Sequence, residues 1–327
     1  MIVDSFNRIH SYLRISLTEK CNLRCTYCMP EAGIPLRPQK FFMTTEEVFS
    51  IASRFVEMGV TKIRLTGGEP MVHKNFEEIL LKLAQLPLEL TLTTNAVLLD
   101  NHLAAIKEAN IKSINISLDT LNRDRFKFIT RRDNYDKVIA NIRLAISSGI
   151  KVKLNAVLMN GVNDDEIIDF VELSRQNDIS VRFIEFMPFD GNNWNWEKKV
   201  SEKQILDTIR DKYGSDQLHK ITDQPNDTSH NYRIKNFKGT FGIITTVTNP
   251  FCDTCNRIRL TADGKIKNCL FSNNETDLLT ALRNNEPIEE LIRSAITKKQ
   301  HSRAGLRFDN ESIQADYNNR SMISIGG

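Results

Sequence analysis

The residues best suited to chemistry in this sequence are its six cysteines, which fall into two sets of three. The first set is Cys21, Cys25 and Cys28, and the second set is Cys252, Cys255 and Cys269. Residues 1–12 carry no signal-peptide pattern, so we expect a cytoplasmic chain in a reducing compartment, where disulfides are disfavoured. Closely spaced thiols in such a compartment indicate ligation of a metal or a cluster.

Each cysteine set supplies three thiolates, whereas a structural zinc ion almost always has four protein ligands. A 4Fe–4S cluster held by three thiolates leaves one iron open to bind another molecule. We therefore expect a 4Fe–4S cluster at each set, with zinc as the alternative. Arg257 and Arg259 follow Cys255 on a predicted strand, where their spacing puts both on one face. This pair suits an anionic ligand such as a nucleotide, and a solvated charged face is the alternative.

Segments rich in Ile, Leu and Val alternate with helical patterns over the first two thirds of the chain. The predicted strands are 12–17, 62–65, 89–93, 113–118, 151–157 and 181–186, and the predicted helices are 45–58, 76–83, 101–108, 135–147, 164–176 and 201–212. Such repeats predict a parallel sheet with right-handed crossovers, either open or closed into a full or partial barrel. Only six strands precede the change of pattern, which argues against a full eight-stranded barrel. Ligands are expected at the carboxyl ends of these strands.

The pattern changes after about residue 187, and residues 231–269 are expected to be antiparallel. Asp263-Gly264 predicts a two-residue hairpin turn that pairs Ala262 with Lys265 and Ile258 with Cys269. We predict a division into a barrel domain, 1–220, and a C-terminal region, 221–327, that carries the second cysteine set.

Cations occupy several of the predicted parallel strands, which are normally near-continuous apolar runs. They are Arg14, Arg64, Lys153 and Arg182. An unpaired buried cation is costly, so these side chains predict a bound polyanion, with ion pairs to nearby carboxylates as the alternative.

Composition excludes several classes of protein. The chain has 327 residues, 40% of them hydrophobic and 26% charged, which is ordinary for a globular protein. The formal net charge of +3 is far from that of a general nucleic-acid binder. No apolar run approaches the roughly 20 residues of a membrane span. We therefore expect neither nucleic acid nor membrane among the partners.

Cys21-x3-Cys25-x2-Cys28, with Tyr27 before the last cysteine, resembles the signature of the radical S-adenosylmethionine (SAM) superfamily, and Gly67-Gly68-Glu69-Pro70 resembles its second motif. Nearly the whole chain resembles the GTP 3′,8-cyclase family. Segments that carry this resemblance include Thr93-Thr94-Asn95, residues 115–119, residues 182–187, residues 251–259 and the terminal Ile325-Gly326-Gly327. Ala96 departs from the family, which usually has glycine there, and this puts the local turn geometry in question.

The resemblance implies an incomplete (β/α)6 radical SAM barrel whose mouth is closed by a partly antiparallel α+β C-terminal region. It implies a SAM-binding 4Fe–4S cluster on the first cysteine set and a substrate-binding 4Fe–4S cluster on the second. The SAM contacts it implies are Tyr27, Gly68, Ser117 and Met187. The GTP contacts it implies are Arg14, Arg64, Thr93, Lys153, Arg257 and Arg259, with Lys62 and Arg182 as further triphosphate contacts. It also implies that Gly326-Gly327 threads into the barrel mouth.

The implied activity is conversion of GTP to 3′,8-cyclo-7,8-dihydro-GTP, the first step of molybdenum cofactor biosynthesis. The implied partners are a reductant such as flavodoxin or ferredoxin, cyclic pyranopterin monophosphate synthase as the next enzyme, and a second copy in a homodimer. One alternative is a radical SAM enzyme that matures a peptide with an auxiliary cluster. Another is a non-catalytic metal- or cluster-containing nucleic-acid-binding module.

Overall fold

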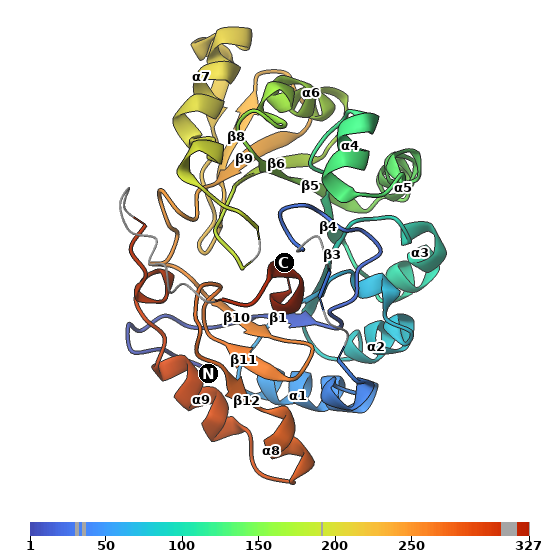
Figure 1. Cartoon of the computed structure of the whole chain (residues 1–327), viewed down its shortest axis with the longest axis vertical. Coiled ribbons are helices and arrows are strands. Elements are labelled where there is room, and N and C mark those ends of the chain that lie inside the picture. The colour runs from blue at the N-terminus through green and yellow to red at the C-terminus, as the bar shows by residue number, and fades with distance from the viewer. Residues whose placement is uncertain (30–32, 35–36, 191, 309–318, 327) are drawn as a thin grey trace.

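A computed structural model describes residues 1–29, 33–34, 37–190, 192–308 and 319–326. Its described strands form one mixed sheet of twelve, in the order β12-β11-β10-β1-β2-β3-β4-β5-β6-β9-β8-β7. Figure 1 shows this sheet curving around a central space, with helices along its convex side and the C-terminus within the curve. The fold is thus an incomplete parallel barrel with a mixed C-terminal part.

The six predicted strand–helix repeats are confirmed with small shifts at their ends. The strands are β1 (Tyr12–Ser16), β2 (Lys62–Thr66), β3 (Glu89–Thr94), β4 (Ser113–Ser117), β5 (Lys151–Leu158) and β6 (Ser180–Glu185), each parallel to the next. The helices are α1 (Thr45–Glu57), α2 (Phe76–Leu83), α3 (Leu99–Glu108), α5 (Tyr135–Ser147) and α6 (Ile167–Gln176), with α4 (Arg123–Thr130) as an additional helix that was not predicted.

Alternation along the parallel strands separates the core from the central space. Along β5, Val152, Leu154 and Ala156 are buried in the hydrophobic core, whereas Lys153 and Asn155 alternate with them and are only partly buried. Because successive side chains of a strand point to opposite faces, the second group faces the concave side. This side therefore collects the polar residues that could meet a ligand.

The C-terminal region extends the same sheet at both edges. β9 (Thr240–Ile244) pairs in parallel with β6 and continues into antiparallel β8 (His230–Ile234) and β7 (Leu218–Lys220). β10 (Arg257–Leu260) pairs in parallel with β1 and continues into antiparallel β11 (Lys265–Lys267) and β12 (Thr276–Asp277). The expected antiparallel arrangement is therefore only partly right, because the strands that join the barrel are parallel to it.

The remaining helices are α7 (Glu202–Tyr213), α8 (Leu279–Arg283), α9 (Glu289–Thr297) and α10 (Met322–Ile325). Of these, only α7 was predicted. Figure 1 places the C-terminus and its short helix inside the curve of the sheet.

The predicted register of the β10–β11 hairpin is wrong by one residue. Arg259 pairs with Lys267, and the amide of Thr261 donates to the carbonyl of Lys265, so three residues form the loop. Gly264 takes a positive φ of 69°, and its amide donates to the carbonyl of Thr261. The Thr261 hydroxyl accepts from the amide of Lys265 and donates to the carboxylate of Asp263, and these contacts favour the longer loop.

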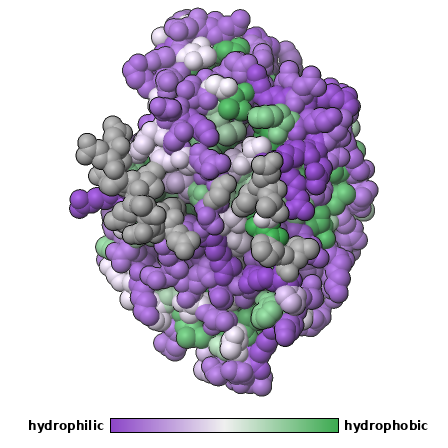
Figure 2. All heavy atoms as spheres, viewed as in Figure 1, coloured by the Kyte–Doolittle hydropathy of each residue, from purple (hydrophilic) through white to green (hydrophobic). Residues whose placement is uncertain are grey.

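Hydrophilic residues predominate on the face seen in Figure 2, with hydrophobic residues scattered in small groups. Scattered apolar side chains are normal on a protein surface. Within the described part of the chain, no helix is both long enough and apolar enough to cross a bilayer.

Candidate functional site

A cavity of about 500 Å³ lies on the concave side of the sheet, and both cysteine sets line it. Every residue predicted for the site lies on its wall. They are Cys21, Cys25, Cys28, Cys252, Cys255, Cys269, Tyr27, Gly68, Ser117, Met187, Arg14, Lys62, Arg64, Thr93, Lys153, Arg182, Arg257 and Arg259. Residues more than 200 positions apart in sequence thus share one enclosed space.

The first cysteine set lies in the loop that follows β1. The amide of Leu23 donates to Cys21 Sγ at 3.4 Å, and Asn95 Nδ2 lies 3.7 Å from the same sulfur. Burial raises the pKa of the Cys21 thiol to about 11 and that of Cys28 to about 12. These buried thiols are protonated in the free protein and must lose their protons to become metal ligands. Binding of a metal or cluster here is therefore coupled to proton release.

Gly68 lets the loop with the first cysteine set cross β2 at very short range. A Cβ at Gly68 would lie 2.4 Å from the carbonyl oxygen of Lys20 and 2.9 Å from Ile323. The Gly68 amide donates to the carbonyl of Thr18 at 2.7 Å, which ties the two loops together. Any larger residue would push the loop that carries Cys21 away from the sheet.

The Glu69 carboxylate organises the turn after β3, a role that the motif alone did not reveal. It accepts hydrogen bonds from the Thr94 hydroxyl at 2.8 Å, the Asn95 amide at 2.7 Å and the Met71 amide at 3.2 Å. Burial raises the pKa of Glu69 to about 7, although these hydrogen bonds oppose the shift. Glu69 thereby fixes Asn95, the residue that approaches Cys21.

Ala96 adopts the left-handed conformation that the usual glycine would favour. Its φ is 62°, its side chain is fully buried, and its carbonyl accepts from Asn141 Nδ2 at 2.7 Å. Its amide donates to the Thr94 hydroxyl at 2.9 Å. The turn geometry is therefore maintained by these contacts at the conformational cost of a non-glycine residue with positive φ.

Asp119 is a second buried carboxylate that sequence reasoning left without a role. Its Oδ2 accepts from the Tyr27 hydroxyl at 2.7 Å, and its Oδ1 accepts from the Val157 amide at 2.9 Å. Burial raises the pKa of Asp119 to about 6. Through Tyr27, this carboxylate fixes the loop of the first cysteine set against β4 and β5.

Cations from neighbouring strands crowd the part of the cavity wall formed by the barrel. Arg64 Nη1 donates to the Thr93 hydroxyl at 3.2 Å, and Arg64 Nε donates to the hydroxyl of Tyr12. Burial, followed by repulsion from Arg182 and Arg64, lowers the pKa of Lys153 to about 8. Burial and the charge of Arg64 likewise lower the pKa of Arg182 to about 10. These groups disfavour one another's charge, as expected where a polyanion is to be bound.

Buried arginine nitrogens on the cavity wall have no hydrogen-bond partner among the described residues. They include Arg182 Nε, Arg257 Nη1 and Arg303 Nε. Asp227 raises the pKa values of Lys153 and Arg182, but the net shifts of both remain downward. The alternative of cations neutralised by nearby carboxylates therefore receives little support. Lys62 differs, because it pairs with Glu89 at 2.7 Å.

Lys299 lies beside the second cysteine set and was not singled out from the sequence. Its Nζ donates to Cys255 Sγ at 3.5 Å and to the carbonyl of Arg257 at 3.1 Å. Burial would raise the pKa of Cys255, but the charges of Lys299 and Arg257 lower it to about 7. Hydrogen bonds to ligand sulfurs tune iron–sulfur sites, and the Lys299 ammonium is placed to make such a bond to Cys255.

The described end of the chain packs against Arg259 and against the carboxyl ends of β1 and β2. The carbonyl of Gly326 accepts a hydrogen bond from Arg259 Nη1 at 2.5 Å. A Cβ at Gly326 would lie 2.5 Å from Thr66 Oγ1, and the φ of 82° also favours glycine. Gly326 therefore contacts a cation of the cavity wall, while the threading of Gly326-Gly327 into the barrel mouth stays a prediction, because Gly327 lies outside the described residues.

The arrangement of donors does not by itself separate a zinc ion from a cluster. Among the described residues, no group of three or more His, Cys, Asp or Glu side chains is placed to hold a metal ion. The two cysteine sets nevertheless share one cavity with hydrogen-bond donors to their sulfurs. Three cysteine thiolates with hydrogen-bond donors to sulfur are compatible with an iron–sulfur cluster.

Comparisons with known proteins agree with these features. The Radical SAM superfamily matches residues 15–174, and Molybdenum Cofactor Synthesis C matches residues 179–304. A crystal structure of Streptococcus suis SuiB bound to S-adenosylmethionine has a TM-score of 0.60 and 16% identity, covering 88% of this chain and 68% of that chain. This likeness concerns the fold alone.

Curated relatives are more similar in sequence. Molybdenum cofactor biosynthesis protein 1 of Drosophila melanogaster is 49% identical over 94% of this chain, which spans about half, 55%, of that relative. GTP 3′,8-cyclase, mitochondrial, of Arabidopsis thaliana is 46% identical over 100% of this chain and 84% of the relative. GTP 3′,8-cyclase of Peptoclostridium acidaminophilum is 41% identical over 100% of this chain and 98% of the relative. The chain therefore belongs to the GTP 3′,8-cyclase family of the radical SAM superfamily.

Proposed function

We propose that this chain is a radical SAM enzyme that converts GTP to (8S)-3′,8-cyclo-7,8-dihydroguanosine 5′-triphosphate in the first step of molybdenum cofactor biosynthesis. The observation that carries the proposal is one cavity lined by two cysteine sets and by a group of mutually repelling cations. Two clusters would account for the two cysteine sets, and a nucleoside triphosphate would account for the cations.

In this proposal Cys21, Cys25 and Cys28 hold the 4Fe–4S cluster that binds SAM, and Cys252, Cys255 and Cys269 hold the cluster that binds the substrate. When bound, the first cluster supplies the electron that cleaves SAM. The protein contributes binding, orientation and exclusion of water. Tyr27, Gly68, Ser117 and Met187 line the SAM site, where the Tyr27–Asp119 hydrogen bond fixes the cluster loop.

The cations orient the nucleotide. Arg14, Arg64, Thr93 and Lys153 project from parallel strands into the cavity and bind the triphosphate, and Lys62 and Arg182 assist them. Arg257 and Arg259 lie beside the second cysteine set and bind the nucleotide there. Bound phosphates would relieve the repulsion among these cations, and this relief favours binding of the triphosphate.

The remaining expectations keep the status of predictions. The division at residue 220, the reductant protein, the following synthase and the homodimer are all proposals. So is the cytoplasmic location, since one relative carries the name mitochondrial. Neither a peptide-maturing role nor a nucleic-acid-binding role is favoured, because a cationic cavity of this size suits a small polyanion.

The experiment that tests the proposal is anaerobic reconstitution followed by product analysis. We expect about eight irons per chain, since each cluster has four. Cys21→Ala should abolish formation of 5′-deoxyadenosine, whereas Cys269→Ala should retain some 5′-deoxyadenosine and lose the cyclised nucleotide. Zinc in either site, or SAM cleavage with GTP left intact in the wild-type protein, would contradict the proposal.

A further inference from the structure

The C-terminal segment reaches the cavity with little secondary structure of its own. Met322 and Ile323 line the cavity, and Ile325 packs in a small apolar cluster with Phe189 and Phe271. α10 has only four residues, and isolated helices far longer than this are marginal in water. Contacts outside the helix must therefore hold it in place.

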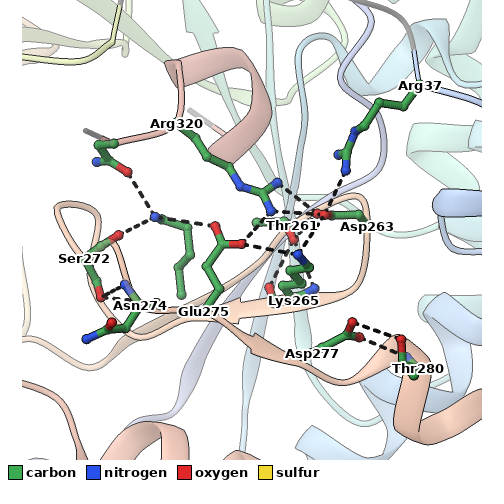
Figure 3. Close-up of polar contacts among 12 residues, drawn as sticks. Arg37, Thr261, Asp263, Lys265, Ser272, Asn274, Glu275, Asp277, Thr280 and Arg320 are labelled. Carbon is green, nitrogen blue, oxygen red and sulfur yellow. Dashed lines mark hydrogen bonds and ion pairs between the residues drawn. The ribbon is translucent and has the colours of Figure 1, made fainter.

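An ion network lies at the base of this segment, just before α10. Arg320 donates through Nη1 to Asp263 Oδ1 and through Nη2 to Asp263 Oδ2, each at 3.0 Å. Its Nη2 also reaches Glu275 Oε2 at 2.5 Å. The Asp263 side chain is only 4% exposed, so this pairing is shielded from solvent. Figure 3 shows Arg320 directed at the loop between β10 and β11, where Asp263 lies.

The same carboxylate also reaches the loop of the first cysteine set. Arg37 Nη1 donates to Asp263 Oδ2 at 3.0 Å, and Arg37 Nη2 donates to Glu19 Oε1 at 2.5 Å. Glu19 precedes Cys21 by two residues. Figure 3 shows the two arginines meeting Asp263 from different sides. Burial would raise the pKa of Asp263, but hydrogen bonds from Arg320, Thr261 and Arg37 hold it below its ordinary value.

A second set of hydrogen bonds joins the C-terminal segment to the region of the second cysteine set. Asn319 Oδ1 accepts from the buried Lys267 Nζ at 3.0 Å, and Asn319 Nδ2 donates to the carbonyl of Leu270 at 2.9 Å. Leu270 directly follows Cys269. Residues 319 and 320 are thus bound to the hairpin that precedes Cys269. Among the described residues, Asp263 and Glu19 both contact Arg37 and Arg320, but Glu19 lies 3.9 Å from Arg320, whereas Asp263 accepts hydrogen bonds from both arginines.

We propose that Asp263 is a positioning residue that holds the C-terminal segment in the cavity and sets its place relative to both cysteine loops. The segment brings the Gly326 carbonyl to Arg259, which lies in the proposed nucleotide site, so the effect on substrate rests on the proposed function. Retention of the segment itself rests only on the contacts given above. An uncharged amide presents a single acceptor oxygen and cannot pair with two guanidinium groups as the carboxylate does.

The test compares Asp263→Asn with Asp277→Asn in the full-length reconstituted enzyme. Asp277→Asn removes the same charge from the neighbouring strand β12. Among the described residues, the Asp277 carboxylate accepts hydrogen bonds only from Thr280, at 2.9 Å (Figure 3). Hydrogen exchange read by mass spectrometry should show amides 322–326 exchanging about tenfold faster in Asp263→Asn. Amides of α5 should be unchanged, and Asp277→Asn should match the wild type throughout.

Wild-type exchange of residues 322–326 in Asp263→Asn overturns the proposal. If Asp263→Asn instead accelerates exchange everywhere, Arg320→Gln decides, because Arg320 lies outside the barrel frame. Arg320→Gln should accelerate only the C-terminal amides, and wild-type exchange there overturns the proposal. Calorimetry with GTP and with SAM adds a functional readout, in which Asp263→Asn should weaken GTP binding more than SAM binding. Absence of GTP binding in the wild type would refute the proposed function. The exchange result would still test whether Asp263 holds the C-terminal segment in place.

Discussion

Lys153 provides a pH signature of triphosphate binding. Burial and the neighbouring cations lower its pKa to about 8 in the free protein. A bound phosphate favours the charged form and raises the pKa, so binding above pH 8 must take up a proton. The sign follows directly: GTP affinity is constant below the free-state pKa and falls as the pH rises through it. Lys153 alone should reduce the affinity by up to roughly 20-fold between pH 7.5 and 9.5.

Tyr12 titrates in the same range and has to be separated from Lys153. Burial would raise the pKa of Tyr12, but Arg64 and Arg14 lower it to about 8. Its phenolate would add a negative charge to the cavity wall at high pH and weaken binding further. We therefore expect Lys153→Met to lose one part of the pH dependence and the Lys153→Met/Tyr12→Phe double variant to lose nearly all of it.

The assay is anaerobic titration calorimetry with GTP and separately with SAM. At pH 7.5, Lys153→Met removes one charge-assisted hydrogen bond worth about 1.5–3 kcal/mol, which corresponds to a loss of about 10- to 160-fold in GTP affinity. Lys151→Met is the matched control, because Lys151 lies on the same strand but is exposed and does not line the cavity. The reasoning is refuted if Lys153→Met binds GTP as tightly as the control, or if both ligands lose affinity equally.

Three further predictions concern single residues. Lys299→Met should lower the midpoint potential of the second cluster by roughly 20–60 mV, because a cation that favours the reduced form is lost. An EPR-monitored redox titration measures this shift, and an unchanged potential would show that the contact with Cys255 is incidental. Gly326→Ala should reduce formation of the cyclised nucleotide about tenfold or more while SAM binding persists, because the new Cβ meets Thr66. The control is Gly149→Ala, since Gly149 also has a positive φ but a Cβ there meets no atom within 4 Å. Equal losses in both variants would contradict the prediction. Glu69→Gln should lower the free energy of unfolding by about 1–3 kcal/mol, because one amide oxygen cannot replace two carboxylate oxygens that accept three hydrogen bonds. Urea denaturation measures this change, and a wild-type urea midpoint would contradict the structural role of Glu69 in the turn after β3.

The barrel could be predicted from sequence because its determinants are local. α1 begins at a capping box in which Thr44 and Glu47 exchange hydrogen bonds, and its buried residues recur at helical spacing. The hairpin register was wrong because the choice between a two-residue and a three-residue loop depends on side-chain contacts of Thr261 with Asp263 and Lys265. Local patterns did not distinguish these loops.

The cysteines and cations of the cavity wall could be predicted from sequence, whereas the groups that support them could not. The cysteines and strand cations stand out by type and spacing. Lys299 and Arg320 look like ordinary surface cations in the sequence, and their partners Cys255 and Asp263 lie 44 and 57 positions away. Only the folded chain brings such pairs together, so no spacing rule identifies them.

The central claim is that the two cysteine sets, one binding SAM and the other GTP, serve a single reaction in one cavity. In that reaction the ribose C3′ loses its hydrogen and bonds to C8 of the guanine. The most direct measurement is a single anaerobic turnover with SAM and GTP deuterated at the ribose C3′ position, followed by mass spectrometry of both products. We predict deuterium in 5′-deoxyadenosine together with a cyclised nucleotide that has lost it. Unlabelled 5′-deoxyadenosine, or labelled GTP recovered unchanged beside cleaved SAM, would contradict the account.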